Sequence, residues 1–141
     1  MTTYKAVLDA SVVLAWIFKE RGFNNIQAAL SASCISAVNL AEVLYTAKSK
    51  GYKGGLDDLQ ASLSNIGLGV VPFTSEEAAL VPFVHERGQS LGRQPTTLQG
   101  SLSLADCACI ATALNLEIPV VSGDVLWTAL NIQGLQVINF R

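Results

Sequence analysis

The sequence predicts an α/β fold with three layers, in which helices cover both faces of a mostly parallel central sheet. Short apolar segments typical of strands alternate along the chain with longer segments of helical periodicity. Half of the 141 residues are hydrophobic and only 14% are charged, as expected when whole strands are buried between two layers of helices. The length fits a single domain, which we place at residues 1–141.

The first half of the chain predicts two strands, each followed by helices. Tyr4–Leu8 is a short apolar run that ends at Asp9, and the apolar spacing over Val12–Phe18 is helical. Ser36 is a typical helix N-cap, and Gly51 is a typical helix end. The predicted elements are a strand over Tyr4–Leu8, helices over Val12–Lys19 and Asn24–Ala32, a strand over Cys34–Ile35, a helix over Ala37–Lys50, and a helix that follows Gly54 and Gly55 and runs to about Asn65.

In the second half, local signals mark where two long helices begin. Thr74 and Glu77 form a capping-box pattern, and Ser103 is a second N-cap. Pro82 predicts a kink or a local break, and the polar stretch Gly88–Gly100 predicts an exposed loop. The predicted elements are a strand within Gly67–Phe73, a helix from Thr74 to about Arg87, a helix over Leu104–Leu116, a strand over Pro119–Val121, a short helix after Asp124, and a last strand over Gln136–Ile138.

Composition argues for a soluble cytoplasmic protein and against several classes of binding protein. No apolar run reaches the roughly 18 residues of a membrane-spanning helix, and Asp9 interrupts the stretch where a signal peptide would be apolar. Cys34, Cys107 and Cys109 lack the C-x-x-C spacing of zinc and redox sites. Cys107 and Cys109 lie two apart in an apolar helical run, so we expect them to be buried thiols. A net charge of −2 argues against a broad basic surface for nucleic acid, but it leaves room for a nuclease that holds phosphates through bound cations.

Four carboxylates stand apart from the other charges. Each is the only charged residue in a long stretch of the sequence and has apolar neighbours, and they are Asp9, Glu42, Asp106 and Asp124. An ionised carboxylate in apolar surroundings costs several kcal/mol unless a cation or hydrogen bonds compensate it. Asp9 and Asp124 follow predicted strands, and open parallel sheets place their ligand crevice at the carboxyl ends of strands.

One shared divalent cation would compensate all four acids at once. Hard oxygen ligands without a nearby His or Cys pair favour Mg²⁺ or Mn²⁺ over zinc. Each acid also has a structural explanation: Asp9 and Asp124 could be N-caps, and Asp106 completes a capping-box pattern with Ser103. Glu42 could lie on a solvent-facing stripe. Because four separate explanations would be needed, we favour one metal site.

Four segments, taken together and in this order, resemble the PIN domain family and most closely its VapC group of toxin ribonucleases; the segments are Val7–Ser11, Ser36–Val43, Leu102–Asp106 and Val120–Asp124. The resemblance implies a PIN-like α/β/α fold and a Mg²⁺- or Mn²⁺-dependent endoribonuclease that hydrolyses RNA. It also implies pairing with a VapB-type antitoxin, and we expect a homodimer that does not associate with membranes.

Carried over by position, the resemblance makes Asp9, Glu42, Asp106 and Asp124 the catalytic residues and metal ligands. Three further residues are implied to support them. Ser11 could hold Asp9 or a metal-bound water, Asn39 lies one helical turn before Glu42, and Ser122 stands where relatives often have Thr.

The sequence departs from this pattern around the last two acids. Relatives often have a basic residue directly after each of them, whereas this chain has Cys107 and Val125. Some relatives also have a further acid beyond the fourth, where Leu126 and Trp127 stand here, so the number of cations stays open. Arg93, in the predicted loop, is a candidate substrate contact.

In the mechanism that we expect, the cation lowers the pKa of a bound water, and the resulting hydroxide attacks the phosphodiester in line. Asp9 and Asp106 would be inner ligands. Glu42 and Asp124 would hold waters, and one of them would accept the nucleophile's proton.

Other functions fit the residues less well. A haloacid-dehalogenase-like phosphatase needs a second acid where Ser11 stands, and a phospho-receiver domain needs a late lysine, but no lysine follows Lys53. Neither a G-x-G-x-x-G turn nor a P-loop is present. The remaining alternative is a catalytically inactive PIN-like module that binds a partner protein, and an apolar groove between the Asn24–Ala32 and Ala37–Lys50 helices is a candidate docking site for an antitoxin segment.

Overall fold

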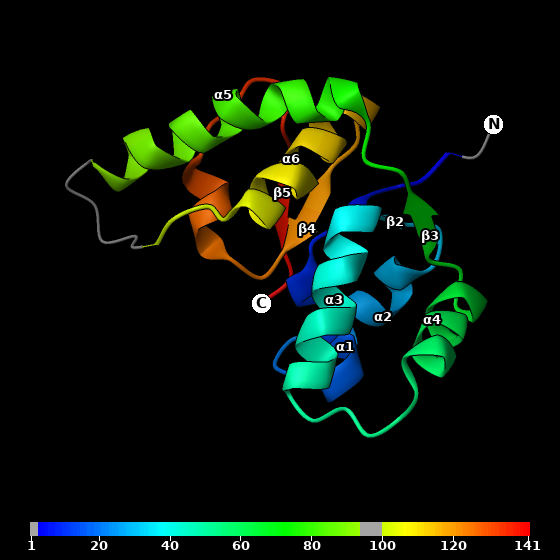
Figure 1. Ribbon diagram of the computed structural model, residues 1–141. Coiled ribbons are helices and arrows are strands. Elements are labelled where there is room, and N and C mark those ends of the chain that lie inside the picture. Colours follow the sequence, from blue (N-terminus) through cyan, green and yellow to red (C-terminus); the bar gives the residue numbers. More distant parts are fainter. Residues whose placement is uncertain (1–2, 94–99) are drawn as a thin grey trace.

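Over residues 3–93 and 100–141, which the computed structural model describes, a five-stranded sheet forms the centre of the protein. The strand order is β3-β2-β1-β4-β5, and every pair of neighbouring strands is parallel (Figure 1). The sequence analysis predicted a mostly parallel sheet, and this prediction is confirmed. The strands are β1 (Val7–Leu8), β2 (Cys34–Ser36), β3 (Gly69–Val71), β4 (Val120–Ser122) and β5 (Val137–Asn139).

Helices cover both faces of this sheet and complete the three layers. Leu8, Ile35 and Val121 belong to a buried cluster with the first four helices, whereas their strand neighbours belong to a second cluster with the later ones. Alternate residues of a strand point to opposite faces, so each strand supplies both cores. The helices are α1 (Ala10–Phe18), α2 (Phe23–Leu30), α3 (Ala37–Ser49), α4 (Leu56–Asn65), α5 (Ser75–Gly92), α6 (Leu104–Leu116) and a 3₁₀ turn, η1 (Val125–Ala129).

The strand order creates one edge where chemistry is expected. The chain builds β1, β2 and β3 in one direction and then returns to place β4 on the other side of β1. Open parallel sheets bind ligands at such a reversal, outside the carboxyl ends of the strands. Because α1 and α3 directly follow β1 and β2, their N-termini lie at this same edge, where the helix dipole favours negative charge.

The local break expected at Pro82 and the helix end expected near Arg87 are both wrong. The helix runs without interruption through Pro82 and continues to Gly92, so the predicted loop at Gly88–Gly100 is helical in its first part. Pro82 is exposed, and water can therefore satisfy the carbonyl that loses its partner. Gly88 is buried inside the helix, where a Cβ would come within 2.8 Å of a Leu102 methyl group, so this glycine serves close packing. Residues 94–99 of the predicted loop lie outside the described residues.

All three cysteines are core residues, which confirms the burial predicted for Cys107 and Cys109. Cys34, Cys107 and Cys109 are buried free thiols. Burial raises the pKa of Cys34 and of Cys107 to about 11, which keeps both thiols protonated and unreactive at neutral pH.

None of the helices in the described part of the chain combines the length and the apolar character that crossing a bilayer requires.

Candidate active site

The four isolated carboxylates lie on elements that meet at the carboxyl edge of the central strands. Asp9 directly follows β1, and Asp124 follows β4, its hydrogen-bonded neighbour in the sheet. Asp106 lies in the first turn of α6 and Glu42 in the second turn of α3. Since α3 and α6 contact one another, residues from four distant segments reach one region of the protein.

The acids are close enough to influence one another's ionisation. Burial raises the pKa of Asp9, and the charge of Asp106 raises it further, outweighing the hydrogen bonds that lower it. Burial also raises the pKa of Glu42, with smaller contributions from Asp9 and Asp106. The pKa of Asp106 is raised by burial and by Asp124. No basic side chain is among the groups that shift these three pKa values, so the negative charge of the group lacks a compensating partner within the described residues.

Two serine hydroxyls hold the carboxylate of Asp9. Ser11 Oγ donates to Asp9 Oδ2 at 2.7 Å, and Ser122 Oγ donates to the same oxygen at 3.0 Å. The serines in turn accept from the backbone, because Gly123 N donates to Ser11 Oγ and Asp124 N donates to Ser122 Oγ, each at 3.0 Å. This network connects the ends of β1 and β4 and leaves Asp9 Oδ1 without a serine partner.

The hydrogen bonds of Asp9 also show that this residue is not simply a helix N-cap. The residue occupies the N-cap position of α1, but its side chain makes no capping hydrogen bond. It is 5% exposed, so a carboxylate is buried in the protein for a reason other than capping.

Asp106 and Asp124 do cap the elements that follow them. Asp106 Oδ2 accepts from Ser103 N at 2.9 Å, and Ser103 Oγ accepts from Asp106 N at 3.1 Å, which completes the capping box. Asp124 Oδ1 accepts from Leu126 N at 3.0 Å, and Asp124 is exposed. Capping therefore explains the presence of these two acids. Each capping bond uses only one carboxylate oxygen, so the other oxygen of each acid is not needed for the cap.

Asn39 joins α3 to α6 beside the acids. Its side chain is completely buried, and Nδ2 donates to the carbonyl of Ala105 at 3.0 Å and to Glu42 Oε1 at 3.5 Å. Oδ1 is buried without a hydrogen-bond partner. Sequence reasoning placed Asn39 near Glu42 but missed the link to α6, because one sequence gives no sign of which carbonyl the amide meets.

The donor set fits a hydrated divalent cation better than a fully protein-ligated one. Within residues 3–93 and 100–141, no group of three or more His, Cys, Asp or Glu side chains is arranged so that it could hold a metal ion. Mg²⁺ usually keeps several waters and takes only one or two carboxylates. Such a cation would balance the charge of the acids. One of its waters could donate a hydrogen bond to Asn39 Oδ1, which has no partner.

Arg93 does not reach the acids in the described part of the protein. It is exposed at the C-terminal end of α5, and the ion pairs of the described residues join Lys50 and Arg141 to Glu20 instead. Its proposed contact with substrate stays a prediction.

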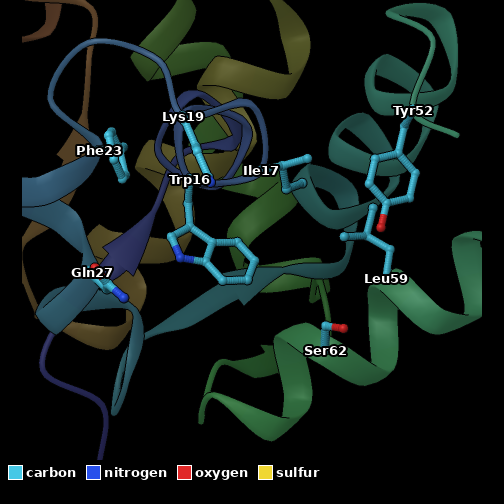
Figure 2. Close-up of a pocket in the computed structure, with 8 residues that line it drawn as sticks. All are labelled: Trp16, Ile17, Lys19, Phe23, Gln27, Tyr52, Leu59 and Ser62. Atoms are coloured by element: carbon cyan, nitrogen blue, oxygen red, sulfur yellow. The ribbon is translucent and has the colours of Figure 1, made fainter. Parts of the chain in front are cut away.

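An apolar hollow of about 320 Å³ lies on the α1–α4 side of the sheet. Figure 2 shows Trp16, Ile17 and Leu59 around it, with Tyr52 reaching in from the chain between α3 and α4. The sequence analysis expected a groove between α2 and α3, and this was wrong in part: α2 lines the hollow, but α1 and α4 replace α3. The buried side chains of α3, Val43 and Ala47, belong to the core cluster on this face of the sheet.

Comparison with known proteins agrees with this architecture. The model of the PIN domain family matches residues 6–129. Among solved structures, the chain is similar to a toxin–antitoxin complex from Klebsiella pneumoniae (17% identity, TM-score 0.71, covering 96% of this chain and 98% of that one). It is also similar to VapBC2 from Rickettsia felis bound to a fragment of promoter DNA (17% identity, TM-score 0.66, covering 95% of this chain and 97% of that one). A third similar structure is FitAcB from Neisseria gonorrhoeae (18% identity, TM-score 0.66, covering 96% of this chain and 97% of that one).

No curated protein matches the chain. At these identities, the solved structures establish the fold. The family model goes further, because it matches the chain from the strand before Asp9 to the turn after Asp124 and so includes all four acids. The chain belongs to the PIN domain family.

Proposed function

We propose that this protein is a Mg²⁺- or Mn²⁺-dependent endoribonuclease that hydrolyses RNA phosphodiester bonds and acts as the toxin of a VapBC-type pair. The observation that carries the proposal is the group of four acids at the carboxyl edge of β1 and β4. Burial raises the pKa of three of them, and the charges of the neighbouring acids raise it further. No basic side chain of the described residues is among the groups that shift these three pKa values. A bound dication would relieve the repulsion among the acids.

The fold supports different tasks for the four acids. Asp9, Asp106 and Asp124 each have one oxygen held by hydrogen bonds. Because Asp9 is buried and Asp106 is partly buried whereas Asp124 is exposed, we assign direct contact with the cation to Asp9 and Asp106. Glu42 and Asp124 would hold waters, and the raised pKa of Glu42 suits it to accept the proton of the attacking water. When bound, Mg²⁺ or Mn²⁺ would neutralise charge on the phosphate and acidify a coordinated water.

Cleavage of an unstructured RNA tests this assignment. The wild-type protein should cut it in Mn²⁺ and should stop when EDTA is added, and Asp9→Asn should be at least about a hundredfold slower, as expected for the loss of a catalytic carboxylate. Asp57→Asn is a matched control, because Asp57 is an exposed acid on α4. Unchanged cutting by Asp9→Asn, or in EDTA, would contradict the assignment.

We also propose that a VapB-type antitoxin binds the hollow lined by Trp16, Ile17 and Leu59. The similar solved structures named above are toxin–antitoxin complexes, and the hollow offers apolar side chains to a partner segment. Co-purification with the product of a neighbouring antitoxin gene should fail for Ile17→Asp and persist for Val70→Asp, which changes an exposed apolar residue on β3. Equal recovery with both variants would place the antitoxin elsewhere.

Two further parts of the proposal concern assembly and location. We propose that the protein forms a homodimer and works in the cytoplasm, where its RNA substrate is found. Light scattering on the purified protein measures the first, and a monomer at all concentrations would contradict it.

The competing function is a PIN-like module that has lost catalysis and only binds a partner. The two differ in cation binding. Calorimetric titration should detect Mn²⁺ binding by the wild-type protein, and an inactive module would give no heat.

A further inference from the structure

Tyr45 is the most exposed of the large hydrophobic residues in the described part of the chain. Three quarters of its surface is accessible, and it lies on α3 three residues after Glu42. Residues three apart on a helix are neighbours on its surface. Tyr45 therefore presents an aromatic face next to the candidate active site, and the core gains nothing from its ring.

Within the described residues, no basic side chain directly follows the last two acids of the candidate site to hold a phosphate. Cys107 and Val125 directly follow the last two acids, and Cys107 is buried while Val125 is 54% exposed. No basic side chain contributes to the pKa shifts of Asp9, Glu42 or Asp106. Contacts with the substrate must then come from side chains further from the last two acids, such as those along the exposed face of α3.

An exposed aromatic ring supplies such a contact with unpaired nucleic acid. Bases of a single strand stack on aromatic side chains, and each stack contributes to affinity without adding charge to the protein. In a duplex the bases are stacked on one another and cannot reach a protein ring, so the contact selects single-stranded segments. Lys48 is exposed on α3 three residues after Tyr45, where its ammonium group can contact a phosphate of the same RNA strand.

We propose that Tyr45 is a substrate-contact residue on which an unpaired RNA base stacks, with Lys48 contacting a phosphate beside it. The inference rests on the proposed ribonuclease function and adds substrate-contact residues to it: the RNA strand would lie along the exposed face of α3, outward from Glu42.

Binding of labelled RNA by the intact protein tests the proposal. The parent carries Asp9→Asn so that RNA stays uncut, and fluorescence anisotropy is measured with an unstructured strand and with a duplex. Tyr45→Ala should weaken single-strand binding by roughly 5- to 150-fold, the range of one base–aromatic stack. Tyr45→Trp should restore it, and duplex binding should be the same in all variants. Phe83→Ala is the matched control, since Phe83 is a half-exposed aromatic on α5, which supplies none of the four acids.

Salt dependence separates the two contacts. Lys48→Gln should reduce the slope of log affinity against log salt by about 0.7, and Tyr45→Ala should leave the slope unchanged. Single-strand affinity that is unchanged in Tyr45→Ala, while the parent binds RNA, would overturn the proposal and indicate that a protein partner covers this ring. If the parent binds no RNA and the wild-type protein cuts none, both this inference and the proposed function are overturned.

Discussion

At the scale of single residues, Asp9 carries the clearest physical signature of the site. Its side chain is almost completely buried, both serine bonds go to one of its oxygens, and burial raises its pKa above the ordinary value of an aspartate. A buried acid whose folded pKa is raised destabilises the metal-free protein at neutral pH, because the unfolded chain ionises more readily.

Asp9→Asn should therefore stabilise the metal-free protein. In EDTA at neutral pH we expect a gain in the free energy of unfolding, because the folded protein no longer carries a buried carboxylate whose pKa is raised by burial. Between the unfolded and folded pKa values the native state binds more protons, so wild-type stability falls as pH rises. The gain should thus disappear at low pH, where Asp9 is protonated in both states. Urea unfolding across pH measures it, and a loss of stability in Asp9→Asn at neutral pH would contradict the account.

Ser122 gives a second prediction at this scale. Ser122→Ala removes the hydroxyl that donates to Asp9 and accepts from the backbone of Asp124. Because both groups lose a buried partner, we expect a loss of about 1–3 kcal/mol in the free energy of unfolding and a higher pKa for Asp9. Ser122→Thr keeps the hydroxyl and is the control. Thermal unfolding that is the same in Ser122→Ala and wild type would show that the network contributes nothing.

At the scale of elements, α5 shows where local signals mislead. Proline and glycine usually mark the end of a helix, yet α5 continues past both because of its surroundings. Pro82 faces solvent, and Gly88 is required by the neighbouring Leu102. Neither fact is visible in one sequence, since both depend on which segment packs against the helix.

Gly88→Ala should destabilise the protein although alanine is the better helix former. Its Cβ would stand 2.8 Å from a methyl carbon of Leu102, and overpacking of this kind costs about 1–3 kcal/mol. Gly92→Ala in the same helix is the matched control, because the nearest atom to its Cβ is 3.9 Å away. Thermal unfolding should show a lower Tm for the first variant only. An equal or higher Tm for Gly88→Ala would mean that Leu102 moves aside without cost.

At the scale of the whole molecule, sequence patterns were enough to predict the layers but not the contacts of the site. Each strand and helix has a local signal, such as the capping box at Thr74, which the structure contains. The isolation of four acids among uncharged residues marked them as site candidates, and the predicted strands before Asp9 and Asp124 placed those two at the carboxyl edge of the sheet. The capping bonds of Asp106 and Asp124 are local and were among the explanations that the sequence offered. The pairing of Asn39 with Ala105 was out of reach, because the two residues lie on elements distant in the chain.

The central claim is that these acids gather to hold one divalent cation. Titration calorimetry with Mn²⁺, combined with thermal unfolding, measures this without any RNA. Wild-type protein and Asp57→Asn should bind Mn²⁺, and a hundredfold excess of Mn²⁺ over the Kd should stabilise them by about 2.7 kcal/mol. Asp9→Asn and Asp106→Asn should bind far more weakly and gain little. Equal Mn²⁺ affinity in all four proteins, or no binding by the wild type, would contradict the account.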